Sequence, residues 1–202
     1  GPTADGRIKP DVVAPGTWTL SGYSDLYQQQ YDPAPNAQNG RYQYDGWGAP
    51  ADAAYKYLGG TSMAAPLAAG GAAVVRDFYQ KARGHQASAA LVKATLINTA
   101  ADLLDENNDG VLDNAFPIPN VHEGWGRVDL ANATDNRQRF SDEMAPLATG
   151  ATATFTFPIA EAGRPFKATL VWTDYPSSPA AAVNLVNDLD LTVVAPDGTT
   201  FV

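Results

Sequence analysis

The stretch 63–75 constrains the fold more than any other part of the sequence, because it contains only Met, Ala, Pro, Leu, Gly and Val. A helix that is apolar on every side is stable only when it is buried, so this stretch predicts a helix packed inside a domain. Polar residues at 79–83 and then Gly84 predict where that helix ends. The pair Gly70 and Gly71 lowers helix propensity, and close packing at this pair is expected to compensate.

Three other segments before residue 136 have interpretable patterns. Residues 88–100 predict a second helix with Ser88 as its N-cap, and its apolar side is expected to hold Leu91, Leu96 and Ile97. Residues 12–14 predict a short buried strand. Residues 23–57 hold seven of the nine tyrosines and show no persistent period. This last segment is predicted to be a long surface excursion, which either borders a cleft or is only a decorated loop.

From about residue 136 the pattern changes to alternation. Runs at 151–157, 166–173 and 185–193 predict half-buried antiparallel strands, and the Pro-Asp-Gly sequence at 196–198 predicts a turn. The predicted fold class is α/β followed by an all-β part, with domains at residues 1–138 and 139–202. Three or four strands leave the edges and one face of a β-sandwich exposed, so the sandwich is expected to be incomplete here and to continue in a parent protein.

The charge balance and composition exclude several classes of function. Lys plus Arg is 13 and Asp plus Glu is 22, which gives a formal net charge of −9. Such an acidic chain is not expected to bind the phosphate backbone of nucleic acids. The absence of cysteine excludes disulfides, thiolate metal sites and cysteine nucleophiles. No run of 18 apolar residues occurs, so no membrane partner is expected.

The sequence Gly59-Gly60-Thr61-Ser62 leads directly into the predicted apolar helix. A serine at a helix start presents its hydroxyl where N–H groups are free and the helix dipole is positive, and these groups can stabilise an oxyanion. Glycines before it would let a substrate backbone approach. The pattern therefore fits a nucleophile, although a helix N-cap is the commoner role of such a serine.

Four segments, in order along the chain, resemble those of the subtilisin-like serine peptidases, the subtilases. Residues 60–66 (Gly-Thr-Ser-Met-Ala-Ala-Pro) resemble the family's nucleophile motif. The others are 1–16, 68–70 and 124–128, which resemble the segment before the serine, the small-residue helix after it and the end of the catalytic domain. Residues 170–174 and 185–191 are similar to the C-terminal jelly-roll of certain secreted bacterial alkaline subtilases. The resemblance implies a parallel-sheet peptidase domain, then a jelly-roll, with Ser62 as the nucleophile of a secreted endopeptidase that hydrolyses polypeptides.

The chain also departs from the family pattern. The triad of the family runs Asp, His, Ser along the chain, but no histidine precedes Ser62, and both His85 and His122 follow it. The asparagine that donates to the oxyanion should also lie upstream, since Asn36 and Asn39 are poor candidates. We therefore expect a fragment truncated at both ends, which holds one triad residue and is inactive by itself because a serine without a general base is a weak nucleophile.

Two groups of acidic residues are candidates for structural calcium. Residues 105–113 resemble the front of an EF-hand loop, in which the candidate ligands are Asp105, Asn107, Asp109, the carbonyl of Val111, and Asp113. The bidentate glutamate is missing, because position 12 of the loop is Phe116. The second group is Asp174, Asp188 and Asp190, supported by the resemblance to calcium-binding jelly-rolls. The alternative in each case is a solvated acidic surface without a metal.

Two other functions compete with the peptidase. One is a non-catalytic, calcium-stabilised binding or adhesion module on a protease-derived scaffold. The other is a different serine hydrolase, which is weakened because the motif around Ser62 lacks the second glycine of a nucleophile elbow, and Ala65 stands where a Ser-x-x-Lys enzyme has lysine. No organic cofactor is expected, and the sequence does not indicate an oligomeric state.

Overall fold

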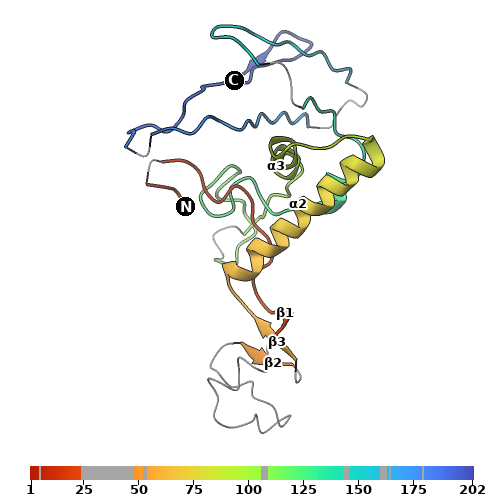
Figure 1. Ribbon diagram of the computed structural model, residues 1–202, viewed down its shortest axis with the longest axis vertical. Coiled ribbons are helices and arrows are strands. Elements are labelled where there is room, and N and C mark those ends of the chain that lie inside the picture. Colours follow the sequence, from red (N-terminus) through yellow and green to blue (C-terminus); the bar gives the residue numbers. More distant parts are fainter. Residues whose placement is uncertain are drawn as a thin grey trace. The chain divides into compact units, whose positions relative to one another are not determined.

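The structure is a computed structural model, and it describes residues 1–4, 6–23, 48–51, 54–105, 109–142, 146–159, 163, 165–178 and 180–202. The chain divides into two compact units, and each is described by itself. The first consists of Gly1–Val12 together with Ala72–Val202, and the second is Val13–Gly71. This division does not test the predicted domains at 1–138 and 139–202, which stay a prediction. Figure 1 labels those helices and strands for which there is room.

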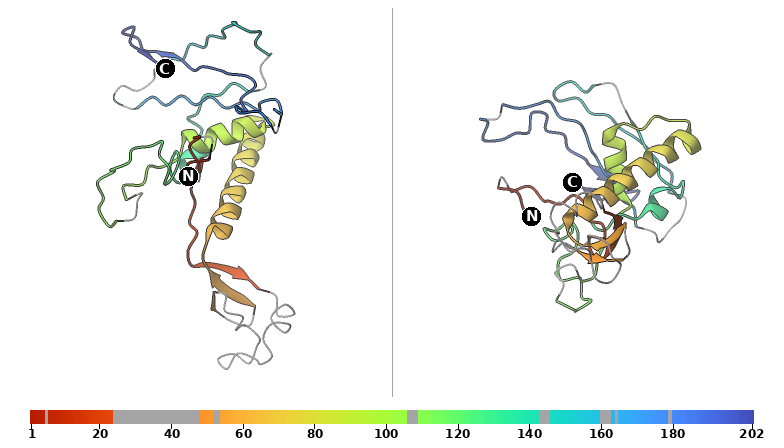
Figure 2. Two further views of the ribbon diagram at one scale, coloured as in Figure 1. Left: turned by 90° about the vertical axis from the view of Figure 1, so that its left-hand side faces the viewer. Right: turned by 60° about the horizontal axis from the view of Figure 1, so that its bottom comes forward.

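The second unit contains a three-stranded antiparallel sheet. Its strands are β1 (Thr19–Gly22), β2 (Ala49–Pro50) and β3 (Tyr55–Leu58), in the order β1-β3-β2. Thr19 pairs with Leu58 and Gly22 with Tyr55, so β1 lies along the full length of β3 (Figure 2). The sheet was not predicted, and most of the tyrosine-rich excursion, 24–47 and 52–53, lies outside the described residues.

The side chain of Lys56 is fully buried in β3, between two tyrosines that face outward. Its Nζ lies 4.2 Å from the centroid of the Tyr23 ring, which is the geometry of a cation–π contact. Lysine is buried only where its charge has such a partner. This contact therefore orients β3, the strand that leads into the glycines before Ser62.

Helix α2 (Thr61–Arg83) forms where the apolar run predicts it and ends as expected. Gly84 has φ of +62°, which glycine adopts without the strain that a Cβ would cause, and the His85 N–H donates to the Tyr79 carbonyl over 3.1 Å. Helix α2 is only partly buried, because Val75 is 0% exposed whereas Leu67 is 45% and Val74 is 47% exposed. The prediction of a helix buried on every side is therefore wrong for the described residues.

Helix α3 (Ala89–Asn98) begins at the predicted cap, where the Ser88 side chain accepts from the Leu91 N–H over 3.0 Å. A short helix, α4 (Leu130–Ala133), is capped by Asp129. The core of the first unit lies between these helices and α2, and it consists of Val75, Tyr79, Ala87, Leu91, Val92, Leu96 and Ala133. The Tyr79 hydroxyl reaches Thr95 Oγ1 over 2.9 Å, which satisfies the polar end of a buried ring.

The predicted β part is largely unpaired. Its one hairpin consists of β4 (Val193–Val194) and β5 (Thr200–Phe201) around the predicted turn, in which the Gly198 N–H donates to the Ala195 carbonyl over 2.9 Å. The described parts of 151–157, 166–173 and 185–191 form no strand, and Phe155 and Phe166 are about half exposed. The described residues therefore show no sandwich, because these runs have no partner strand there to bury their apolar side.

The paired strands of the described residues are all antiparallel, so the expected parallel sheet is not found there. Residues 12–14 form no strand, and Val13 takes part only in an isolated bridge. A parallel pair needs two strands joined by a crossover, and the one strand predicted before Ser62 has no parallel neighbour in the described part of the chain.

Candidate active site

Ser62 lies in the first turn of α2 and is exposed to solvent. Neither its hydroxyl nor its backbone N–H has a hydrogen-bond partner among the described residues. The Met63 N–H, one residue further on, is already held by the Gly60 carbonyl over 3.0 Å. The hydroxyl and a backbone donor are therefore both available at the positive end of a helix of 23 residues.

A pocket of about 260 Å³ opens beside Ser62 within the second unit. It is lined by Thr19, Leu20 and Ser21 of β1 and by Ser62, Met63, Pro66 and Leu67 of α2. Leu20, Pro66 and Leu67 give it apolar walls. The β1 residues were missed by the sequence analysis, because a strand and a helix start far apart in sequence share no pattern that would place them together.

The glycines before Ser62 are held by a close backbone contact. The Gly60 N–H donates to the Gly16 carbonyl over 2.5 Å, and Gly60 has φ of +141°, a conformation that side chains rarely allow. A Cβ on Gly16 would lie 2.9 Å from the Gly60 carbonyl oxygen. Both positions therefore need glycine to keep the segment before Ser62 in place.

The two histidines make contacts within the first unit. His85 Nε2 lies 2.7 Å from Asp142 Oδ2, and its ring packs 5.0 Å from that of Phe140. The His122 ring packs 4.7 Å from the ring of Phe116. The second unit, which holds Ser62, contains no histidine. The expectation that neither His85 nor His122 is the general base stays a prediction.

In the acidic loop at 105–113, residues 106–108, and with them Asn107, lie outside the described residues. Asp105 Oδ1 accepts from the Asp109 N–H over 2.9 Å, and Asp109 Oδ1 accepts from the Val111 N–H over 2.9 Å. Asp113 Oδ1 accepts from the Ala115 N–H over 3.1 Å. The described residues bring no three acidic or histidine side chains together, and calcium binding at this loop stays a prediction.

The second calcium candidate fits a metal less well. The Asp174 carboxylate accepts from the Val186 N–H over 2.7 Å and from the Asn187 N–H and Nδ2 over 3.0 and 2.8 Å. The bond from Val186 is the main cause that lowers the pKa of Asp174, helped by those from Asn187. N–H donors occupy both oxygens of the Asp174 carboxylate, which therefore joins two segments of the chain. These contacts give no support to a metal site formed with Asp188 and Asp190.

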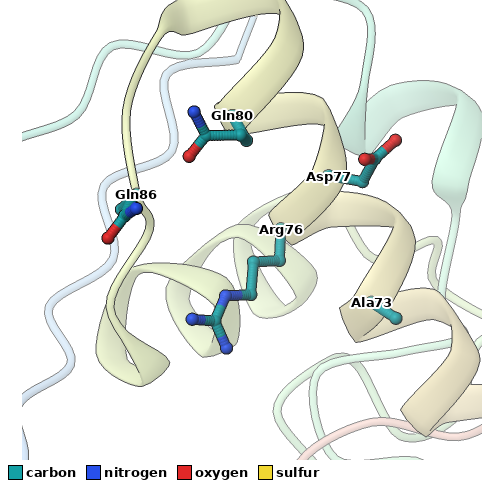
Figure 3. Close-up of a pocket in the computed structure, with 5 residues that line it drawn as sticks. All are labelled: Ala73, Arg76, Asp77, Gln80 and Gln86. Carbon is teal, nitrogen blue, oxygen red and sulfur yellow. The ribbon is translucent and has the colours of Figure 1, made fainter.

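A larger pocket of about 320 Å³ lies in the first unit, away from the predicted residues. Arg76, Gln80 and Gln86 lie on one side of it in Figure 3, with Asp77 and Ala73 on the other. Asp77 pairs with Lys81 over 2.8 Å. All four polar side chains are exposed, so this is a hollow of the surface without a buried polar group that would select a ligand.

An unpartnered serine at a helix start, beside a pocket and with a free N–H, is typical of enzymes that use serine as a nucleophile. The profile of the Subtilase family matches residues 1–126. The chain therefore belongs to the subtilase family of serine peptidases.

Curated relatives agree with this family. The serine protease/ABC transporter B family protein tagA of Dictyostelium discoideum is 33% identical over 215 residues, which cover 96% of this chain and 11% of that protein. The related tagD of the same organism is 27% identical over 242 residues, covering 96% of this chain and 12% of that protein. The chain thus spans about a ninth of these relatives. In the described part of the chain, no helix has the length and apolar character needed to cross a membrane.

Proposed function

We propose that this chain supplies the nucleophile of a serine endopeptidase and that Ser62 is that nucleophile. The observation that carries the proposal is the exposed Ser62, whose hydroxyl and N–H are both unpartnered among the described residues beside a pocket. The position agrees with the family's serine motif at 60–66. The curated relatives are named serine proteases, which supports a polypeptide as the substrate.

The chemistry that follows is acyl transfer. Ser62 Oγ attacks the carbonyl carbon of a peptide bond while a histidine takes its proton, and the tetrahedral oxyanion is stabilised by the Ser62 N–H. The same histidine then gives its proton to the leaving amine, and water hydrolyses the acyl-enzyme. The Gly59-Gly60 backbone borders the substrate, since neither residue has a side chain to exclude it.

We assign the general base, its aspartate and the second oxyanion donor to parts of the protein outside this chain. His85 is engaged with Asp142, and His122 packs on Phe116. Without a base the Ser62 hydroxyl has little nucleophilicity, so the 202 residues alone are expected to be inactive. Peptide hydrolysis by this chain alone would contradict the assignment.

The β part and the loop at 105–113 support three further proposals. The alternating runs at 166–173 and 185–191, which Asp174 joins through Val186 and Asn187, belong to a jelly-roll whose remaining strands lie elsewhere in the protein. Calcium binds at the loop through Asp105, Asn107, Asp109, Val111 and Asp113, and stabilises the folded state. The absence of cysteine together with a calcium loop is consistent with a secreted enzyme.

The nucleophile is tested with a fluorophosphonate probe on the natural protein. We expect the Ser62→Ala variant to lose all labelling and to reduce peptide turnover by about 10⁶-fold, because the attacking oxygen is removed. Ser21→Ala is the matched control, since it removes a hydroxyl from the same pocket and should keep labelling. Labelling that persists in the Ser62→Ala variant would disprove the assignment.

A further inference from the structure

The Glu123 side chain is buried in the first unit, at 1% exposure, without a basic partner among the described residues. It directly precedes the segment 124–128, and the proposed acyl transfer does not use it. A buried carboxylate is costly unless a cation or several donors compensate its charge. The groups around Glu123 therefore decide which protonation state it adopts.

Two neutral donors reach Glu123. The Leu103 N–H donates to Oε2 over 3.1 Å, and Asn120 Nδ2 donates to Oε1 over 3.3 Å. The Asn120 amide is fixed in this orientation, because its Oδ1 accepts from the N–H groups of His122 and Glu123 over 2.8 and 3.0 Å. These bonds place the Glu123 carboxyl but supply no positive charge.

The next carboxyl is that of Asp102, whose chain neighbour Leu103 donates its N–H to Glu123 and whose charge acts on the Glu123 carboxyl. Its Oδ2 accepts from Asn114 Nδ2 over 3.0 Å, whereas its Oδ1 is buried and lacks a partner among the described residues. Two neighbouring carboxylates repel each other when both are ionised. When one of them holds a proton, its O–H can donate to the other. A shared proton thus satisfies the unpartnered oxygen.

We propose that Glu123 carries a proton, that its O–H donates to Asp102 Oδ1, and that this pair fastens the segment 120–127 to the segment 101–103. The backbones are already close at this point. The Ala101 N–H donates to the Arg127 carbonyl over 2.8 Å, and the Arg127 N–H returns a bond of 2.7 Å. A Cβ on Gly126 would lie 2.5 Å from the Ala101 carbonyl oxygen. The backbone contacts therefore hold the two segments that carry the carboxyls side by side.

Burial raises the pKa of Glu123, and the nearby Asp102 raises it further, against the lowering effect of the bonds from Asn120 and Leu103. Two other titratable groups lie nearby. The His122 ring packs on Phe116. The Asp11 carbonyl accepts from the Trp125 N–H, and the Asp11 carboxylate pairs with Lys9 and Lys93. A raised pKa in the folded state stabilises the fold below the ordinary glutamate pKa, and this stability is lost as pH rises through the raised value. The fastening therefore weakens toward alkaline pH.

The test is hydrogen–deuterium exchange of the natural protein, followed in peptides that cover 101–105 and 120–127. In the wild type we expect the opening constant of these segments to rise by up to about tenfold per pH unit between the pKa of the open state and that of the closed state. Glu123→Gln keeps a neutral donor toward Asp102, so its opening constant should not change with pH. Asp102→Asn should weaken the dependence, because it removes one cause of the raised pKa of Glu123 and leaves the burial in place. This variant serves if the first one does not fold.

Asp77→Asn is the matched control, because it removes one exposed carboxylate from α2, and it should keep the wild-type pH dependence. A wild-type opening constant that does not change with pH would overturn the proposal. A second result would also overturn it. If calcium chloride restored protection from exchange at about pH 9 in the wild type but in neither variant, a cation would lie between the two carboxyls.

Discussion

At the scale of single residues, the Asp142 carboxylate accepts three hydrogen bonds within the first unit. It accepts from the Ser88 hydroxyl over 2.5 Å, from the Ser88 N–H over 2.9 Å and from His85 Nε2 over 2.7 Å, and its side chain is 4% exposed. Burial alone would raise the pKa of Asp142, but the bonds from Ser88 and His85 outweigh it and lower the pKa. One carboxylate thus joins a segment that follows the family-matched residues 1–126 to the start of α3.

We expect Asp142→Ala to lower the free energy of unfolding by about 2 to 3 kcal/mol near neutral pH, because the bonds it removes are charge-assisted and the partly buried Ser88 N–H loses its acceptor. A lowered pKa stabilises the fold above the ordinary aspartate pKa, and this contribution is lost as pH falls through the folded value. The variant should therefore approach the wild type in acid.

Denaturant unfolding at several pH values measures this effect, with Asp190→Asn as the control for loss of one exposed carboxylate. An equal destabilisation by Asp142→Ala at acidic and neutral pH would contradict the proposed charge dependence.

Single-residue predictions succeeded where the sequence carries a local signal. Ser88 was predicted as an N-cap, since a capping residue and the helix it starts are neighbours in sequence. Asp142, which holds Ser88 in place, lies 54 residues further on and has no pattern that marks it. The start of α2 next to Ser62 could be predicted because its signals are also local. The β1 side of the pocket beside Ser62 could not be predicted.

At the scale of elements, the helix bounds could be predicted and the strands could not. Gly84 ends α2 as expected, because a positive φ at a helix end favours glycine. Strands need a partner, and alternation at 151–157 or 166–173 says only which side would be buried if a partner were present. The hairpin β4–β5 did form, because its turn residues and both strands lie within a few positions of one another.

Gly84 allows a direct test of this helix end. We expect Gly84→Ala to destabilise the protein by about 1 kcal/mol, because φ of +62° is unfavourable for alanine although open space surrounds the position. The matched control is Gly70→Ala inside α2, where the added methyl also meets open space, and it should stabilise by up to about 1 kcal/mol. Thermal or denaturant unfolding measures both.

A gain in stability from Gly84→Ala would refute the strain argument. A loss from Gly70→Ala would instead show that another layer packs on that side of α2.

At the scale of the whole molecule, the protein family could be predicted from the sequence, but the burial of the helices and strands could not. The motif at 60–66 led to the subtilases, and the family match over 1–126 confirms that assignment. Burial depends on every layer that surrounds an element, and the sequence of one helix does not show which layers are present. The exposed Leu67 and Val74 on α2 and the exposed Phe155 and Phe166 in the β part illustrate this difference.

Calcium is expected to act on the whole molecule by binding only its folded state. At about 100 times its dissociation constant, a single bound ion raises stability by about 2.7 kcal/mol, so a chelator should lower the melting temperature. We expect Asp105→Asn to remove this response, because Asp105 is the first ligand of the proposed loop. Asp174→Asn should keep it, since donors already occupy that carboxylate.

Thermal unfolding with and without chelator measures the response. A melting temperature that does not depend on calcium would exclude the site at 105–113.

The contact between Gly16 and Gly60 also limits how this sequence can diverge. Because any side chain at position 16 would meet the Gly60 carbonyl, a mutation there displaces the backbone that leads into Ser62, although the two positions lie far apart in the chain. A substitution at position 16 is therefore expected to disturb the proposed nucleophile, although Gly16 does not line the pocket beside it.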